Sequence, residues 1–227
     1  WLNDSTVVFI SDRGGNYDIY LGRSSDKNEN DIFESLHREV VKLTDTEKDE
    51  SNILVSPDGK KIAYTIGRGK FVTADISENG DLSNEKVLLD GWASPGGIAW
   101  SPDSKWLAYS LEDLNFNSEI YIHAADNSKE PVNVSMHPRG DMRPVWSSGG
   151  SKLGFISERN NNNYDVWFAW LKKADWQRTK EDWKDYKDEQ EKEKDKGKKK
   201  EDKDSSETVE PVEIDFNNIH KRLVQVT

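Results

Sequence analysis

The chain contains no cysteine, little methionine and few apolar residues. Of its 227 residues none is Cys, two are Met, and only 33% are hydrophobic. The absence of Cys excludes disulfides, thiolate metal ligands and a cysteine nucleophile. No apolar run approaches the roughly 18 residues that a membrane-spanning helix needs, so we expect no such helix. Because the chain begins with Trp1 rather than Met, we expect a processed or excised piece.

Positively charged residues are outnumbered by acidic ones. The 32 Lys and Arg face 43 Asp and Glu, which gives a formal net charge of −11. An acidic surface repels phosphate backbones and anionic lipid, so we expect neither nucleic acid nor membrane as a partner. Nine Trp, seven Tyr and seven Phe argue against a disordered chain, because disordered chains are poor in aromatics. We therefore expect an aromatic-rich folded part and a charged part outside its core.

The charged part is an insertion over residues 172–208. Between Lys172 and Glu207, thirteen basic and thirteen acidic residues cancel, so the whole net charge resides in the rest of the chain. We expect a helix over about 174–196, because charged pairs at helical spacing support a solvated helix. Over about 197–208 we expect a flexible tether, because nothing there can be buried.

Three aromatic residues interrupt this charged segment. Trp176, Trp183 and Tyr186 are separated by seven and three residues, a spacing that places them on one stripe of a helix. The ordinary interpretation is a solvated insertion. The alternative is that these side chains anchor a neighbouring domain or subunit, because aromatic side chains dominate the energetics of interfaces.

The rest of the chain is a repeat of short, β-rich segments. The aromatic residues Phe9, Tyr64, Tyr109 and Phe155 align at separations of 55, 45 and 46 residues. The aligned segments are ILVSPDGKKIAYTI (53–66), IAWSPDSKWLAYSL (98–111) and VWSSGGSKLGFIS (145–157), with WLNDSTVVFIS (1–11) retaining the second half. Two further β-rich runs follow each of them: 17–22 and 39–44, 70–76 and 85–90, 118–125 and 131–135, and 164–171 and 222–227.

This repeat predicts an all-β fold, a β-propeller of four-stranded antiparallel blades. Ser-Pro-Asp-Gly and Ser-Pro-Asp-Ser are turn sequences, and the flanking runs of Ile, Val, Tyr and Trp favour strands. A four-stranded unit of about 45–50 residues is typical of a propeller blade. We expect about four blades in this chain, within a ring of about six or seven. The predicted domains are blades over 1–171, the insertion over 172–208, and a return strand, or the start of another blade, over 209–227.

The motifs also resemble known families. Ser-Pro-Asp-Gly-Lys-x-Ile-Ala-Tyr at 56–64 is similar to the PD40 propeller repeat of TolB-like proteins and of several peptidases. More of the chain resembles the tricorn-type, S41-like serine proteases. The stretches that carry this resemblance are FISDRGGNYDIYL (9–21), FNSEIYIHAAD (116–126), FISERNNNNYDVW (155–167), and EPVEIDFNNIHKRLVQVT (210–227) after the charged insertion.

The resemblance implies a non-catalytic propeller that guides peptide substrate or product and supports assembly. Its partners would be peptides or unfolded polypeptide and the downstream PDZ-like and peptidase domains of a parent protein, with room for a homo-oligomer. An exported, periplasmic location follows from the relatives, although a chain without Cys also suits the cytoplasm. The alternatives are a stand-alone TolB-like interaction scaffold, or the propeller of a prolyl-oligopeptidase-type enzyme.

We identify no catalytic, metal-binding or cofactor-binding residue. The four histidines (His37, His123, His137 and His220) do not pair at metal-ligand spacing, and the chain has no G-x-S-x-G or phosphate-loop motif. We therefore expect no cofactor and no turnover by these 227 residues, and we interpret His123 as a packed or surface side chain within a strand.

Overall fold

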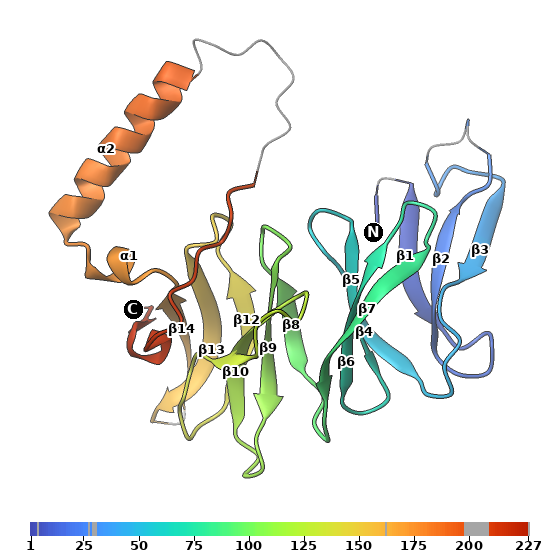
Figure 1. The fold of residues 1–227 in the computed structure, drawn as a ribbon, viewed down its shortest axis with the longest axis horizontal. Helices are drawn as coiled ribbons and strands as arrows, with labels where there is room; N and C mark the ends of the chain where they lie inside the picture. Colours follow the sequence, from blue (N-terminus) through green and yellow to red (C-terminus); the bar gives the residue numbers. More distant parts are fainter. Residues whose placement is uncertain (4, 27, 29–30, 162, 198–208, 227) are drawn as a thin grey trace.

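Four antiparallel sheets follow one another along the long axis of the molecule (Figure 1). The computed structural model describes residues 1–3, 5–26, 28, 31–161, 163–197 and 209–226. We name the sheets blades 1 to 4 in chain order. Blade 1 comprises β1 (Thr6–Ser11), β2 (Asp18–Ser24) and β3 (Arg38–Lys42); blade 2 comprises β4 (Glu50–Val55), β5 (Lys61–Ile66), β6 (Lys70–Ile76) and β7 (Leu82–Asp90); blade 3 comprises β8 (Gly96–Trp100), β9 (Trp106–Glu112), β10 (Ser118–Ala124) and β11 (Val132–Asn133); blade 4 comprises β12 (Asp141–Trp146), β13 (Lys152–Asn160), β14 (Asn163–Trp170) and β15 (Leu223–Gln225). The expected all-β class and propeller blades are confirmed.

Blade 1 contains the counterparts of only the last three strands of the other blades. Phe9 of β1 lies opposite Tyr20 of β2, as Phe155 of β13 lies opposite Trp167 of β14. In blades 2, 3 and 4 the strand that corresponds to β1 also pairs with an inner strand, which is β4, β8 or β12. Within the described residues β1 pairs with β2 on one side, and on its other side Thr6 bonds through its backbone to Leu2 and Asn3.

The repeated turns form through short side-chain hydrogen bonds. In blade 2 the Oγ of Ser56 donates to Oδ1 of Asp58 at 2.6 Å and accepts from the amide of Lys61 at 2.9 Å. In blade 3 the Oγ of Ser101 donates to Oδ1 of Asp103, also at 2.6 Å. Gly59 has φ 68°, a left-handed conformation that glycine adopts without steric cost. These bonds explain why the same tetrapeptide recurs at this point of the blade.

The inner strands share an irregularity. The strand register shifts within β4, β8 and β12, and a residue with positive φ lies at each shift: Asn52, Gly97 and Arg143. All three residues stand four positions before the serine of the following turn. A bulge of this kind bends a strand and increases its twist, so the three blades curve alike.

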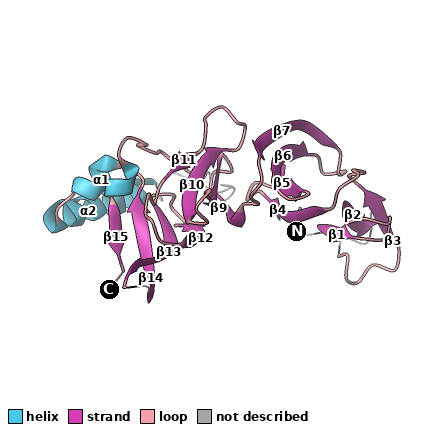
Figure 2. Ribbon diagram, turned by 90° about the horizontal axis from the view of Figure 1, so that it is seen from below, coloured by secondary structure: helices cyan, strands magenta, loops and turns pink. Residues whose placement is uncertain are grey.

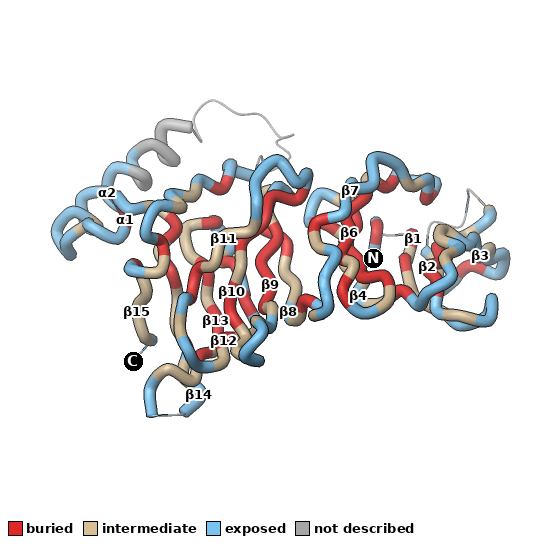
Figure 3. The backbone as a smooth tube through the Cα atoms, turned by 60° about the horizontal axis from the view of Figure 1, so that its bottom comes forward, coloured by how far each residue is buried: buried red, intermediate tan, exposed pale blue. Residues whose placement is uncertain are grey.

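The core consists of three seams between neighbouring blades. One buried cluster joins blades 1 and 2, a second joins blades 2 and 3, and a third joins blades 3 and 4. Buried stretches accordingly run along the strands where sheets face each other (Figure 3). Indole nitrogens link consecutive inner strands, because Trp100 donates to the carbonyl of Leu54 at 3.4 Å and Trp146 donates to that of Ala99 at 3.1 Å. Radial contact between blades therefore buries their aromatic sides.

The charged segment forms two helices rather than the single helix expected over 174–196. They are α1 (Lys173–Gln177) and α2 (Lys180–Gly197), which extends away from the blades (Figure 1). Thr179 separates them: its Oγ1 accepts from the amide of Asp182 at 3.2 Å, and the Asp182 carboxylate accepts from the Thr179 amide at 2.7 Å. This reciprocal cap starts a new helix at Lys180. The tether expected over 197–208 lies outside the described residues beyond Gly197.

After the insertion the chain returns to blade 4. A short 3₁₀ helix, η1 (Ile219–Lys221), precedes β15, which pairs with β14 in antiparallel register. Figure 2 shows the helices at the end of the molecule opposite blade 1, beside β15. Within the described part of the chain, no helix is long and apolar enough to cross a bilayer.

Candidate functional site

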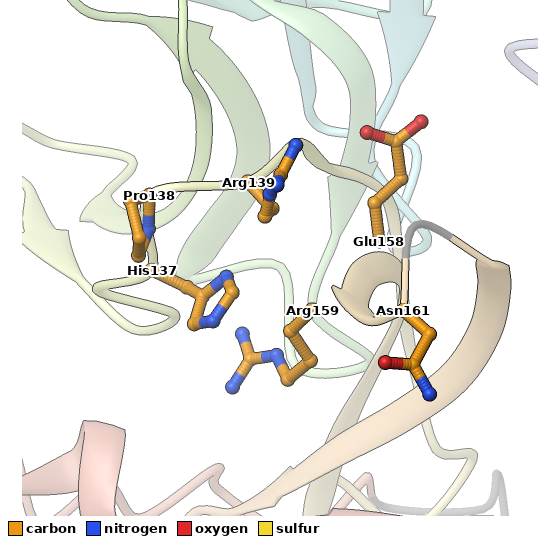
Figure 4. Close-up of a pocket in the computed structure, with 6 residues that line it drawn as sticks. All are labelled: His137, Pro138, Arg139, Glu158, Arg159 and Asn161. Carbon is orange, nitrogen blue, oxygen red and sulfur yellow. The ribbon is translucent and has the colours of Figure 1, made fainter.

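A polar pocket lies between blades 3 and 4 on one rim of the molecule. We call this end the hairpin rim, because it carries the β9–β10 and β13–β14 hairpins and the connections between blades (Figure 1). The pocket has a volume of about 510 Å³. Its lining comes from the β11–β12 connection and from the β13–β14 hairpin (Figure 4): His137, Pro138, Arg139, Glu158, Arg159 and Asn161.

Arg159 is held in place on one side of this pocket. Its Nη2 donates to both carboxylate oxygens of Asp141 at 3.2 Å, and its Nε donates to Oγ of Ser157 at 2.8 Å. The guanidinium also lies over the rings of Trp167 and Phe155, with centroids at 4.9 and 5.5 Å. Because Asp141 is fully buried, this pair fixes the start of the inner strand β12 to the hairpin.

His137 supplies a neutral polar group to the pocket. Its amide donates to Oε1 of Glu119 at 3.0 Å, which fixes the backbone of the β11–β12 connection. Burial, and next the nearby charge of Arg159, lower the pKa of the His137 ring. The Nδ1 atom is buried and has no hydrogen-bond partner among the described residues. In Figure 4 the Arg159 guanidinium lies beside this ring while the Glu158 carboxylate points away.

Exposed apolar residues lie on the same rim. Trp92 in the β7–β8 connection packs edge-to-face against Phe116 in the β9–β10 hairpin, with ring centroids 5.9 Å apart. Phe116 is 75% exposed and Leu114 in the same hairpin is 82% exposed. Phe116 also has φ 60°, a strained conformation for a bulky residue. The rim therefore presents aromatic surface as well as polar groups.

This arrangement offers groups that can bind a polar ligand. The described residues contain no group of three or more His, Asp or Glu that could hold a metal ion. His123 is fully buried in β10, where its ring bonds to Tyr109 Oη at 3.1 Å and to Oδ1 of Asn127 at 3.0 Å. Polar and charged groups on the same rim as exposed aromatics can bind the amides and apolar side chains of a peptide.

The three aromatics of the insertion do not form one stripe. Trp176 lies in α1 and is 43% exposed, whereas Trp183 and Tyr186 lie in α2. Trp183 stacks on Trp170 of β14 at 5.3 Å, and the guanidinium of Arg178 lies over both Trp183 and Tyr186, at 4.7 and 3.9 Å. The base of α2 is thus packed against the chain's own blade 4. The role of the three aromatics as an anchor for another domain or subunit stays a prediction. Trp176 is the best suited of the three to this role, because it is exposed.

The segment after the insertion forms hydrogen bonds to the residues at which the insertion begins. Oδ2 of Asp215 accepts from the amide of Lys173 at 2.7 Å, and the Asp215 amide donates to the carbonyl of Leu171 at 2.9 Å. Arg222 is buried and donates to main-chain carbonyls of Trp170 and Leu171, among others, at 3.0 and 3.2 Å. These bonds give a structural reason for Asp215 and Arg222 in the stretch 210–227 that follows the insertion.

The sequence did not indicate the hairpin-rim pocket. Its residues come from two loops more than fifteen positions apart, and neither loop carries a motif. A usable signal was present, because the aligned repeats place both loops at the same end of the blades. Superposing the repeat units would have brought His137 and Arg159 onto one rim.

Known proteins that are similar to this chain include members of the groups that its repeat resembles. No family model matches the chain. Tricorn protease homolog 1 of Streptomyces coelicolor is 27% identical over 115 residues, which are 48% of this chain and 10% of that protein. The crystal structure of the tricorn protease matches with a TM-score of 0.63 at 16% identity, over 99% of this chain and 20% of that one. TolB from Acinetobacter baumannii reaches a TM-score of 0.49 at 18% identity, over 73% of this chain and 38% of that one.

The match to the tricorn protease extends over nearly the whole chain. The chain spans only 10% of the curated relative and 20% of the solved tricorn protease. At this identity the likeness shows the fold, and the resemblance noted from the repeats is confirmed at that level. The chain is a β-propeller segment that is similar to part of a tricorn protease.

Proposed function

We propose that this propeller segment is a non-catalytic part of a tricorn-like serine peptidase, where it guides peptide substrate or product and supports assembly. The observation that supports this role is the hairpin rim, where a polar pocket of about 510 Å³ shares one end of the blades with exposed aromatics. Peptides present both main-chain amides and apolar side chains, so they suit a surface of this composition.

On this proposal each part of the rim has a task. The ring of His137, kept neutral by its lowered pKa, lines the pocket and exchanges a hydrogen bond with a peptide amide. Phe116 and Trp92 receive apolar side chains of the peptide, because their rings are already exposed. Arg159 orders the pocket wall, since its own charge is compensated by Asp141.

Peptide binding tests the proposal directly. We expect an unstructured, apolar-rich peptide labelled with a fluorophore to bind the chain, with affinity measured by anisotropy. The double variant Trp92→Ser/Phe116→Ser should weaken binding by about tenfold, because exposed aromatics commonly dominate such interfaces. Lys60→Gln is the matched control, because Lys60 is exposed in a turn on the opposite rim. Equal affinity of the aromatic double variant and the parent chain would contradict the proposal.

The parent protein provides a second test. We expect a polypeptide that continues into PDZ-like and peptidase regions and hydrolyses peptides with sensitivity to serine-reactive reagents. Absence of such hydrolysis in the purified parent would refute the peptidase part of the proposal. Turnover by these 227 residues alone would refute the non-catalytic part.

A further inference from the structure

A second pocket lies at the base of the insertion, between α1 and the segment that returns to β15. It has a volume of about 290 Å³, and its lining comes from α1 and from the stretch 215–222. The hairpin-rim pocket lies where β14 begins, whereas this pocket lies beyond the residue at which β14 ends, Trp170. The two pockets are therefore separate sites at opposite ends of one strand.

Trp176 gives this pocket an aromatic wall. Trp183 and Tyr186 are both in contact with the guanidinium of Arg178, whereas among the described residues no ring or guanidinium lies against Trp176. The Trp176 side chain is exposed and lines the pocket. An exposed indole in such a place can pack against an apolar side chain of a ligand.

Basic side chains outnumber acidic ones around this pocket. Its lining contains three basic residues, Lys173, Lys221 and Arg222, and one acidic residue, Asp215. The Asp215 carboxylate already accepts a hydrogen bond from the amide of Lys173 at 2.7 Å. The pocket is thus a locally positive site on a chain whose net charge is −11. A local excess of positive charge favours an anionic group of a ligand.

The two lysines of the pocket lack the partner that a neighbouring lysine has. Nζ of Lys172, the residue before α1, lies 2.6 Å from Oε2 of Glu213. Among the described residues no carboxylate lies within ion-pair distance of Lys173 or Lys221. Both side chains are exposed and line the same pocket, so both ammonium groups are available to a ligand there.

Arg222 adds a buried charge to the same pocket. The residue is 2% exposed, and its guanidinium donates to the main-chain carbonyls of Trp170, Leu171, Asp215 and Asn217. These carbonyls satisfy N–H groups but carry no formal negative charge. A positive charge in such a poorly solvated place attracts an anion more strongly than an exposed charge does.

We infer that this pocket binds a carboxylate of a polypeptide ligand, with an apolar side chain next to that carboxylate packed on Trp176. Lys173 and Lys221 pair with the carboxylate, and the charge of Arg222 adds to the attraction. The pocket is at the small end of the range for ligand sites, so one residue with its carboxylate fills it. The carboxylate belongs either to a C-terminal residue or to an internal Asp or Glu. This inference does not depend on the proposed function, because it concerns a different pocket.

Two pairs of short peptides test the inference and distinguish the two sources of the carboxylate. In the first pair, acetyl-Gly-Gly-Leu ends in a free carboxylate or in an amide. In the second pair, acetyl-Gly-Leu-Glu-Gly-amide is compared with the peptide that has Gln in place of Glu. In at least one pair we expect the carboxylate peptide to bind about tenfold more tightly than its neutral partner, which lacks the charge-assisted bonds. Calorimetry measures the affinity, and a shift of the Trp176 indole resonance locates the site.

Three protein variants separate the pocket from general charge effects. Lys173→Gln/Lys221→Gln should remove most of the preference for the carboxylate peptide. Lys60→Gln/Lys105→Gln is the matched control, because it removes two exposed lysines from the turns of blades 2 and 3, and it should bind as the parent chain does. Trp176→Ser should weaken binding several-fold but keep the preference, because the lysines remain. Circular dichroism checks that all three variants are folded.

Several outcomes would overturn the inference. They are no binding of either carboxylate peptide at millimolar concentration, equal affinities within both pairs, and an unchanged preference in Lys173→Gln/Lys221→Gln. Binding that leaves the Trp176 resonance unmoved would equally overturn it, because the peptide would then occupy another place on the chain.

Discussion

At the scale of single residues, buried charge in this chain depends on specific partners. Asp141 is fully buried and has its compensating charge in Arg159, whose own side chain is 11% exposed. Removing one member of a buried pair leaves the other uncompensated, which costs more than the pair itself contributes. The same principle applies to Arg222, which is buried but surrounded by carbonyl oxygens.

Arg159→Met should lower the free energy of unfolding by about 3 kcal/mol, because Asp141 is then left charged and buried. Urea unfolding followed by tryptophan fluorescence measures this loss. The double variant Asp141→Asn/Arg159→Met is the control and should lose less than the sum of the two single variants, because no orphan charge remains. Additive losses would show that the two side chains stabilise the fold independently.

His123 should make stability depend on pH. Burial lowers the pKa of the His123 ring below the ordinary 6.5. In the folded chain this ring therefore stays neutral at pH values at which the same ring in the unfolded chain binds a proton. Stability is therefore full above about pH 6.5 and falls as the pH decreases below it, by about 1.4 kcal/mol for each unit of the pKa difference. Urea midpoints at pH 7.5 and 5.5 should differ more for the parent chain than for His123→Gln.

The comparison with His123→Gln is needed because two carboxyl groups act in the opposite direction. Burial raises the pKa of Glu50 and of Glu119, so their contributions favour the folded state as the pH falls. Both groups are present in both proteins and cancel in the difference. An equal change of the urea midpoint in the two proteins would exclude His123 as its source.

At the scale of elements, turns that depend on nearby residues could be predicted from the sequence. Sites that form only when separate blades pack together were not predicted. The Ser-Pro-Asp turns were predictable because their bonds join residues at most five positions apart, as between Ser56 and Lys61. The break between α1 and α2 was missed because the cap formed by Thr179 and Asp182 was hidden among charged residues. The pocket at His137 was not predicted, because no motif marks its two loops and only a superposition of the repeat units places both loops on one rim.

We expect that removal of the insertion changes the stability of the blades only slightly. Replacing 180–207 by a short Gly-Ser linker should lower the free energy of unfolding by less than about 2 kcal/mol, since among the described residues the deletion removes the contacts of Trp183 and Tyr186 with Trp170 and Arg178. The base stays fastened, because Asp215 and Arg222 are retained. Thermal unfolding measures the effect.

The control for this deletion is Asp215→Ala in the uncut chain. It breaks the cap on the Lys173 amide and should cost about 1 kcal/mol although no segment is removed. Loss of cooperative unfolding on deletion would show that the insertion is part of the core instead of an addition to it.

At the scale of the whole molecule, blades bury surface through their neighbours. Three seams hold four blades in a row, and the row leaves blade 1 and blade 4 at opposite ends (Figure 1). Because the charges of residues 172–207 cancel, the blades and their connections carry the entire net charge of −11. The propeller surface as a whole is therefore acidic, and this charge acts on any peptide that approaches it.

Peptide charge should accordingly change affinity in a salt-dependent way. Among peptides that differ only in charged positions, those rich in Lys should bind the chain several-fold more tightly than those rich in Glu at low ionic strength. The difference should shrink at about 0.5 M salt, where the screening length falls to roughly 4 Å. Fluorescence anisotropy across a salt series measures both effects, with the neutral peptide of the series as the control. Because the acidic residues are spread over all four blades, reversing one of them should change the ratio only slightly, whereas identical affinities at low salt would exclude electrostatic selection by the propeller.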